Sequence, residues 1–120
     1  MPRAQDLIAT AYQRFIAEVP ALGNMKMVAR LELRGRGDIQ VFRVQLPGPL
    51  VSKQEPADAR LDLSIARSHF NELATEGKLK HWREAYEHGH LKVSGDPQVR
   101  KLLGQVIERQ EARDRLKKVH

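Results

Sequence analysis

The chain has 120 residues, of which 41% are hydrophobic and 30% are charged, a balance typical of one soluble globular domain. It contains no cysteine, so disulfides, thiolate metal ligands and a cysteine nucleophile are excluded. The formal net charge is +6, which suggests nucleic acid or an anionic membrane as a partner. Four of the six excess charges lie in residues 100–120, so the rest of the chain is nearly neutral. The start resembles no secretory signal and no apolar run reaches membrane-spanning length, so we expect a cytoplasmic protein.

The first predicted element is an amphipathic helix that ends at Pro20. Alternating apolar and polar residues then predict two half-buried strands, at residues 25–33 and 39–46. The glycines of residues 34–38 favour a tight reversal, so we expect the two strands to form a hairpin. The helix has an apolar face with helical spacing, made of Leu7, Ile8, Ala11, Tyr12, Phe15, Ile16 and Val19.

A Pro-Gly-Pro turn and a short strand at residues 50–54 follow the hairpin. The clearest alternation of the chain then predicts a longer strand at residues 57–65, with one face buried and the other solvated. Asp58 and Asp62 would share the solvated face. We expect Arg60, which lies between them on that face, to neutralise the pair, so these carboxylates indicate a charge ladder rather than acid–base chemistry.

Two short helices are expected next. The first would be capped by Ser64 or Ser68 and would end at Gly77. The second would span residues 80–88, and a brief strand at residues 90–94 would follow it. Asp96-Pro97 then predicts the start of the last helix, because aspartate is a favourable cap and proline a favourable first helical residue.

The last helix has a dense apolar face only as far as Ile107, so we expect a domain at residues 1–107 and a charged helical extension at residues 108–120. Two interpretations of the extension stay open. It could dock transiently on an anionic membrane, or it could be a solubilising helix end whose charge Glu108, Glu111 and Asp114 dilute. Its basic residues are Arg109, Arg113, Arg115, Lys117 and Lys118.

The sequence shows no catalytic constellation, metal-ligand motif or cofactor-binding motif. His88 and His90 would share a strand face, but no third ligand has a suitable spacing, so we expect solvated surface histidines. None of the four serines has the surroundings of a nucleophile elbow. The glycines of residues 34–38 join two strands and open no helix, which argues against a phosphate-binding loop. We therefore expect no enzyme.

Trp82 and Tyr86 are four residues apart on one predicted helix and should face the same way. As core residues they would seal the domain. As ligand residues they would close a cavity beneath the helix, and both interpretations are open.

From residue 57 onward, the order and spacing of several short motifs are similar to those of the sterol-carrier-protein-2 family, SCP2. The likeness combines an acidic strand, a helical phenylalanine, a G-K-L turn and a G-x-L-x-V-x-G-D strand, and the order of elements extends it over about residues 5–107. The residues that carry it are Ala57-Asp58-Ala59-Arg60-Leu61-Asp62-Leu63-Ser64, Phe70, Leu73, Gly77-Lys78-Leu79, Ala85 and Gly89-His90-Leu91-Lys92-Val93-Ser94-Gly95-Asp96.

The resemblance implies a mixed α/β (α+β) fold with a five-stranded, mostly antiparallel sheet, helices over one face and an apolar tunnel between them. It implies a non-enzymatic carrier of a fatty acyl, sterol-like or isoprenoid quinone ligand. We expect an apolar pocket of at least about 300 Å³. The predicted ligand-binding residues are Phe42, Val44, Leu63, Phe70, Leu73, Trp82, Tyr86, Leu103, Val106 and Ile107.

Two rival functions remain. The same fold could be fully packed and act as an interaction module that forms a homodimer, since apolar stripes alone predict a core and not a void. Nucleic-acid binding through the basic tail is the weaker rival, because no aromatic residues are interleaved with those charges. We expect a lipid or another apolar small molecule as partner, and no nucleic acid.

Overall fold

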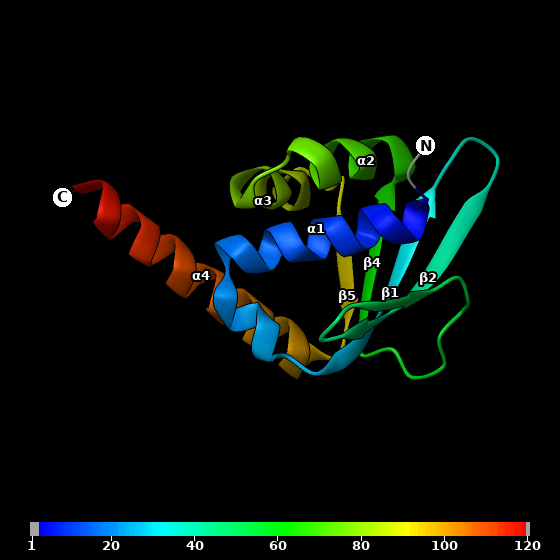
Figure 1. Cartoon of the computed structure of the whole chain (residues 1–120), viewed down its shortest axis with the longest axis horizontal. Helices are drawn as coiled ribbons and strands as arrows, with labels where there is room; N and C mark the ends of the chain where they lie inside the picture. The colour runs from blue at the N-terminus through cyan, green and yellow to red at the C-terminus, as the bar shows by residue number, and fades with distance from the viewer. Residues whose placement is uncertain (1–2, 120) are drawn as a thin grey trace.

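The computed structural model describes residues 3–119, with side chains up to Lys117. Figure 1 shows the elements, with helices gathered over one face of a sheet and the last helix projecting past it. In chain order they are α1 (Ala4–Glu18), η1 (Pro20–Asn24), β1 (Met27–Arg34), β2 (Ile39–Leu46), β3 (Leu50–Ser52), β4 (Leu61–Ala66), α2 (Arg67–Glu76), α3 (Leu79–Glu87), β5 (Lys92–Gly95) and α4 (Pro97–Val119).

The five strands form one open sheet in the order β3-β2-β1-β4-β5. Every neighbouring pair is antiparallel except β1 and β4, which run in parallel. The α+β class and the five-stranded, mostly antiparallel sheet are therefore confirmed. Because the chain passes from β3 at one edge to β4 on the far side of β1, the first strand becomes the centre of the sheet.

The predicted hairpin is confirmed in β1 and β2. The strands pair along their whole length, from Met27 opposite Leu46 to Arg34 opposite Ile39. The backbone N–H of Gly35 donates to the carbonyl of Asp38 at 2.9 Å, which closes the turn. Alternation places the even-numbered residues of β2 toward α1 and the odd-numbered ones on the open face.

The predicted strand at residues 57–65 is too long at its start, since β4 begins at Leu61. The segment before it is still crossing the sheet, and the ladder with β1 begins only where Ala29 faces Leu61. The expected neutralisation of Asp58 by Arg60 is also wrong. Asp58 instead pairs with Arg43 of β2 at 2.7 Å, and Arg60 pairs with Asp96 at 2.6 Å.

The helix boundaries show one wrong cap and one correct cap. The position before α2 is held by Ala66, which has no side-chain oxygen, and Ser64 lies inside β4. Asp96 does cap α4, because its Oδ1 accepts a hydrogen bond from the backbone N–H of Gln98 at 2.8 Å. Asp96 also bonds to Arg60, so the start of α4 is tied to the approach to β4.

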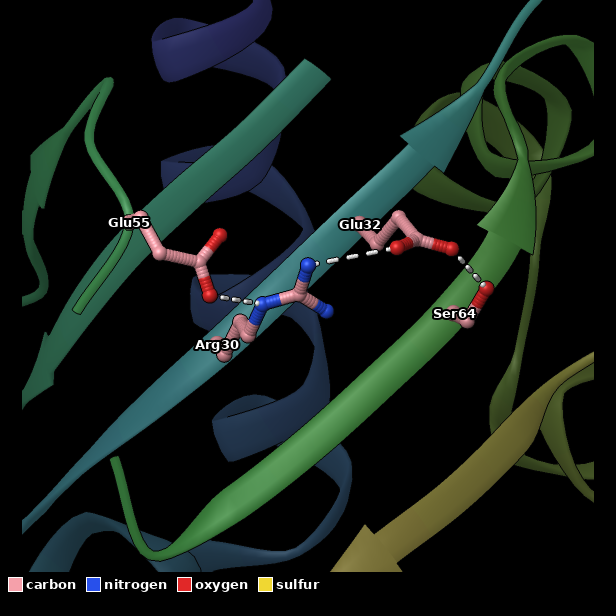
Figure 2. A network of polar contacts seen from close by, with 4 residues as sticks. All are labelled: Arg30, Glu32, Glu55 and Ser64. Carbon is pink, nitrogen blue, oxygen red and sulfur yellow. Dashed lines mark hydrogen bonds and ion pairs between the residues drawn. The ribbon is translucent and has the colours of Figure 1, made fainter. Parts of the chain in front are cut away.

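The polar face of the sheet is held by a small network in which Arg30 links two carboxylates (Figure 2). Arg30 Nε donates to Glu55 at 2.7 Å and Nη2 to Glu32 at 3.3 Å, while Ser64 Oγ donates to the second oxygen of Glu32 at 2.8 Å. Helix α1 lies behind the sheet in this view, so the network belongs to the face that α1 does not cover. The opposite face is left for apolar packing.

The last helix runs without a break to Val119, and none of the helices in the described part of the chain is long and apolar enough to cross a membrane. Arg109, Arg113, Arg115 and Lys117 are exposed, and the side chain of Lys118 lies outside the described residues. The extension still contacts the domain, since Glu111 pairs with Arg83 of α3 at 3.2 Å. Division of the chain at residue 107 stays a prediction.

Candidate functional site

A cavity of about 590 Å³ lies between the inner face of the sheet and the helices. Its floor consists of side chains from β1, β2, β4 and β5, and its walls come from α1, η1, α2, α3 and α4. Nearly all of these side chains are aliphatic or aromatic. Volumes of roughly 300–1,000 Å³ are typical of small-molecule sites, so this space could hold a lipid chain.

Small residues leave this space open. Ala29 lines the floor from the central strand β1, Ala11 lines the cavity from α1, and Gly104 lies on the wall formed by α4. A Cβ built on Gly104 would have no heavy atom within 4 Å apart from its chain neighbours and the adjoining backbone of α4. Protein interiors are normally close-packed, and larger side chains at these three positions would fill volume that is empty here.

The aromatic side chains of the wall hold one another in place. The indole of Trp82 makes edge-to-face contacts with Phe15 of α1 and Phe70 of α2, with ring centroids 6.1 and 6.0 Å apart. Such pairs add about 0.5–1.5 kcal/mol beyond the area that they bury. Trp82 therefore joins three helices and also lines the cavity, so it combines the two roles that the sequence left open.

Tyr86, one turn further along α3, lines the cavity but is 50% exposed, so it lies where the cavity meets solvent. Of the ten predicted ligand-binding residues, the structure brings seven together on the cavity wall. These are Val44, Leu63, Phe70, Trp82, Tyr86, Leu103 and Ile107. Their role in binding a ligand stays a prediction.

The other three predicted residues do not line the cavity. Phe42 points to the same side of the sheet but is sealed in the core with 1% of its surface exposed. Leu73 is buried on another face of α2, beside a separate groove. Val106 packs against a second apolar cluster around Val19, because it lies on α4 to one side of the stripe that faces the cavity.

Sequence reasoning missed the contribution of α1 and of the segment after it. Ile8, Tyr12 and Phe15 of α1 line the cavity, as do Met25 and Met27. Their apolar periodicity was visible, but a buried helix face and a cavity wall have the same pattern.

The hydroxyl of Tyr12 is buried without a hydrogen-bond partner among the described residues, and burial raises the pKa of this phenol.

The charged side chains on the cavity wall are Arg83, Arg100 and Lys101, and no acidic side chain lines it within the described residues. Arg83 is engaged elsewhere, with Glu87 of its own helix at 3.1 Å and Glu111 of α4 at 3.2 Å. Arg100 and Lys101 are exposed and have no ion pair in the described structure. The polar edge of the cavity is therefore cationic.

His69, His81, His88 and His90 lie on a different surface. The rings of His69 and His90 are 5.3 Å apart edge to face, and those of His88 and His90 are 6.3 Å apart. They border the groove between α2 and α3 and do not line the cavity. Over the residues that the structure describes, no group of three or more histidine or acidic side chains is arranged to hold a metal ion.

No protein-family model matches the sequence, and no curated protein matches it. Solved structures do match the fold. Palmitated sterol carrier protein 2-like 2 from Aedes aegypti has a TM-score of 0.58 at 19% identity, over 83% of this chain and 93% of that one. Sterol carrier protein domain 2 of Helicoverpa armigera has a TM-score of 0.59 at 11% identity, over 91% and 92%.

A third structure, Aedes aegypti sterol carrier protein 2 in complex with palmitate, has a TM-score of 0.55 at 13% identity, over 89% of this chain and 96% of that one. These matches cover more than nine tenths of each solved chain. At such low identity, the likeness concerns the fold. The chain has the fold of sterol carrier protein 2.

Proposed function

We propose that this protein is a non-enzymatic lipid carrier that holds an apolar molecule in the cavity between the sheet and the helices. The observation that carries the proposal is the cavity itself, about 590 Å³ of space lined almost entirely by apolar side chains. A cavity of this kind lowers the stability of the folded state. If the same side chains were packed against one another, they would gain dispersion energy and remove apolar surface from water. Binding a lipid restores those contacts.

Two solved proteins with this fold are described as palmitated or as a complex with palmitate, which supports an acyl chain as the occupant. A sterol-like molecule or an isoprenoid quinone is the alternative occupant. The rival function, a fully packed interaction module, is disfavoured by the volume that the packing leaves open. We propose the cytoplasm as the place of action. Homodimerisation stays a prediction.

The proposal is tested by filling the cavity from Gly104. In the Gly104→Phe variant the new ring enters open space on the cavity wall, while phenylalanine is also a better helix former than glycine, so α4 should remain folded. The matched control is Gln105→Phe, which places the same side chain on the next, exposed residue of α4 outside the cavity lining.

Delipidated proteins are incubated with palmitate, and bound lipid is counted by native mass spectrometry. We expect one palmitate on the wild type and on Gln105→Phe, and little or none on Gly104→Phe. Equal loading of all three proteins would show that the cavity is not the binding site. A wild type that binds neither palmitate nor a sterol nor a quinone would refute the carrier function.

A further inference from the structure

The mouth of the cavity lies between α3 and α4. Each exposed residue of the cavity lining belongs to one of these two helices, and all other lining residues are buried or partly buried. The exposed ones are Tyr86 at the end of α3 and Pro97, Arg100 and Lys101 at the start of α4. A molecule that enters the cavity therefore passes between the two helices.

The two ends of α3 are attached to the domain differently. At its start, the side chain of Leu79 is buried, and the backbone N–H of this residue donates to the carboxylate of Glu18 in α1 at 2.8 Å. Its end passes into residues 86–90, which are all exposed. Among them, Gly89 has a φ of 77°, and a Cβ built there would have no heavy atom within 4 Å apart from its chain neighbours. Glycine adopts such a conformation at little cost, so the end of α3 is the end that has room to move.

One ion pair holds α3 to α4 beside this mouth. Nη1 of Arg83 lies 3.2 Å from Oε1 of Glu111, and within residues 3–117 no other ion pair joins α3 to a different element. Arg83 lines the cavity, whereas Glu111 lies about one turn beyond Ile107, the last residue of α4 that lines it. Figure 1 shows α4 running past α3 as it leaves the sheet. The charged part of α4 therefore reaches α3 and bridges the mouth at one end.

We propose that the ion pair between Arg83 and Glu111 is a strap across the cavity mouth, and that the ligand enters and leaves when this pair opens and the end of α3 moves away from α4. This inference rests on the proposed function and adds the route by which the ligand is exchanged. The two side chains are 38% and 25% exposed, so the pair is weak enough to open. Because it joins two helices rather than a helix and the ligand, its loss should raise the rates of uptake and release together and leave the dissociation constant unchanged.

The variant is Glu111→Gln, and its matched control is Glu87→Gln. Each removes one carboxylate from Arg83, but Glu87 lies on α3 itself, 3.1 Å from Nε, and holds α3 to no other helix. Exchange is measured by stopped flow with cis-parinarate, an acyl chain that fluoresces in apolar surroundings, and excess palmitate displaces it. We expect Glu111→Gln to raise both rates about threefold at an unchanged dissociation constant, since partly exposed ion pairs are individually weak. Glu87→Gln should leave both rates at the wild-type value.

A cross-link makes the opposite change. The chain contains no cysteine, so Arg83→Cys with Glu111→Cys has only the two introduced thiols. A bis-maleimide with a cleavable spacer then ties α3 to α4. Protein that is loaded with parinarate and then linked should lose the release that palmitate causes, and cleavage of the spacer should restore it. The linked and cleaved forms have the same two substitutions, so each serves as the control of the other.

The possible failures separate the two proposals. Equal rates in Glu111→Gln and Glu87→Gln, or unchanged release from the linked protein, would overturn the strap and leave the lipid carrier standing. Faster release from Glu111→Gln with unchanged uptake would show that Glu111 stabilises only the loaded protein and would also overturn the strap. Wild-type protein that binds neither of these probes, nor a sterol or quinone, refutes the carrier function itself and with it the exchange route.

Discussion

At the scale of single residues, Glu32 shows how the open face of the sheet is stabilised. Ser64 donates a hydrogen bond to its carboxylate, and this bond, followed by the contact with Arg30, lowers the pKa of Glu32 below its ordinary value. The bond from Ser64 joins β4 to β1, and the bond from Arg30 joins two residues of β1, as Figure 2 shows. The network therefore strengthens the parallel contact between β1 and β4, where Glu32 faces Ser64.

We predict that Ser64→Ala lowers the free energy of unfolding by about 1 kcal/mol at pH 7, the typical net value of one hydrogen bond. Folding lowers the pKa of Glu32. The stabilisation that the ionised Glu32 gives the folded state is therefore present above the ordinary pKa of a glutamate, and it is lost as the pH falls through the pKa that Glu32 has in the folded state. Urea denaturation should therefore show a difference between wild type and variant that shrinks at acidic pH.

Ser94→Ala is the matched control for this prediction. Ser94 is exposed on β5, and its side chain makes no hydrogen bond within the described structure. Its removal should change stability by less than about 0.5 kcal/mol. A loss at Ser64 that stays constant from pH 7 to pH 3 would contradict the role given to the Glu32 carboxylate.

At the scale of elements, the sequence was most informative where periodicity and capping agree. The hairpin and the start of α4 could be predicted, because alternation, turn glycines and the Asp96-Pro97 pair are local signals. The start of β4 could not, since residues 57–60 alternate like a strand but lie outside the ladder with β1, which begins where Ala29 faces Leu61. Pairing across the sheet decides where β4 begins, and this long-range pairing cannot be seen in a single sequence.

The cavity wall, too, could be predicted only in part from local sequence patterns. The apolar faces of α3 and α4 were visible as helical stripes, which is why Trp82 and Leu103 were identified. Whether a residue on such a stripe meets a void or another side chain depends on small residues elsewhere, such as Ala29 and Ala11. Phe42 and Val106 have the same pattern as the lining residues, and neither of them lines the cavity.

The extension of α4 yields a prediction for membrane association. Arg109, Arg113, Arg115 and Lys117 are exposed, and each cation near an anionic surface contributes about 1 kcal/mol to binding. We expect the full chain to co-sediment with anionic vesicles at low salt and less at physiological salt, and a chain lacking residues 109–120 to stay in the supernatant. Neutral vesicles serve as the control. Equal sedimentation of both forms would favour the solubilising interpretation of the extension.

At the scale of the whole molecule, the cavity links stability to occupancy. A ligand that binds the folded chain alone stabilises it by about 2.7 kcal/mol at a free concentration one hundred times the dissociation constant. For a chain of this size we expect the melting temperature to rise by about 8–15 °C in saturating palmitate. Differential scanning calorimetry should show the rise in the wild type and in Gln105→Phe. Gly104→Phe should melt at the same temperature with and without palmitate, and a full shift in that variant would place the lipid elsewhere.

The central position of β1 has a consequence for how the chain emerges during translation. When residues 1–46 have left the ribosome, β1 can pair with β2, but its other edge waits for β4, which follows at Leu61–Ala66. During that interval the strand presents unpaired backbone groups next to Leu31 and Leu33, both of which end up buried. Nascent chains that stall before residue 66 therefore expose an apolar sheet edge, which is a template for aggregation and a natural substrate for chaperones.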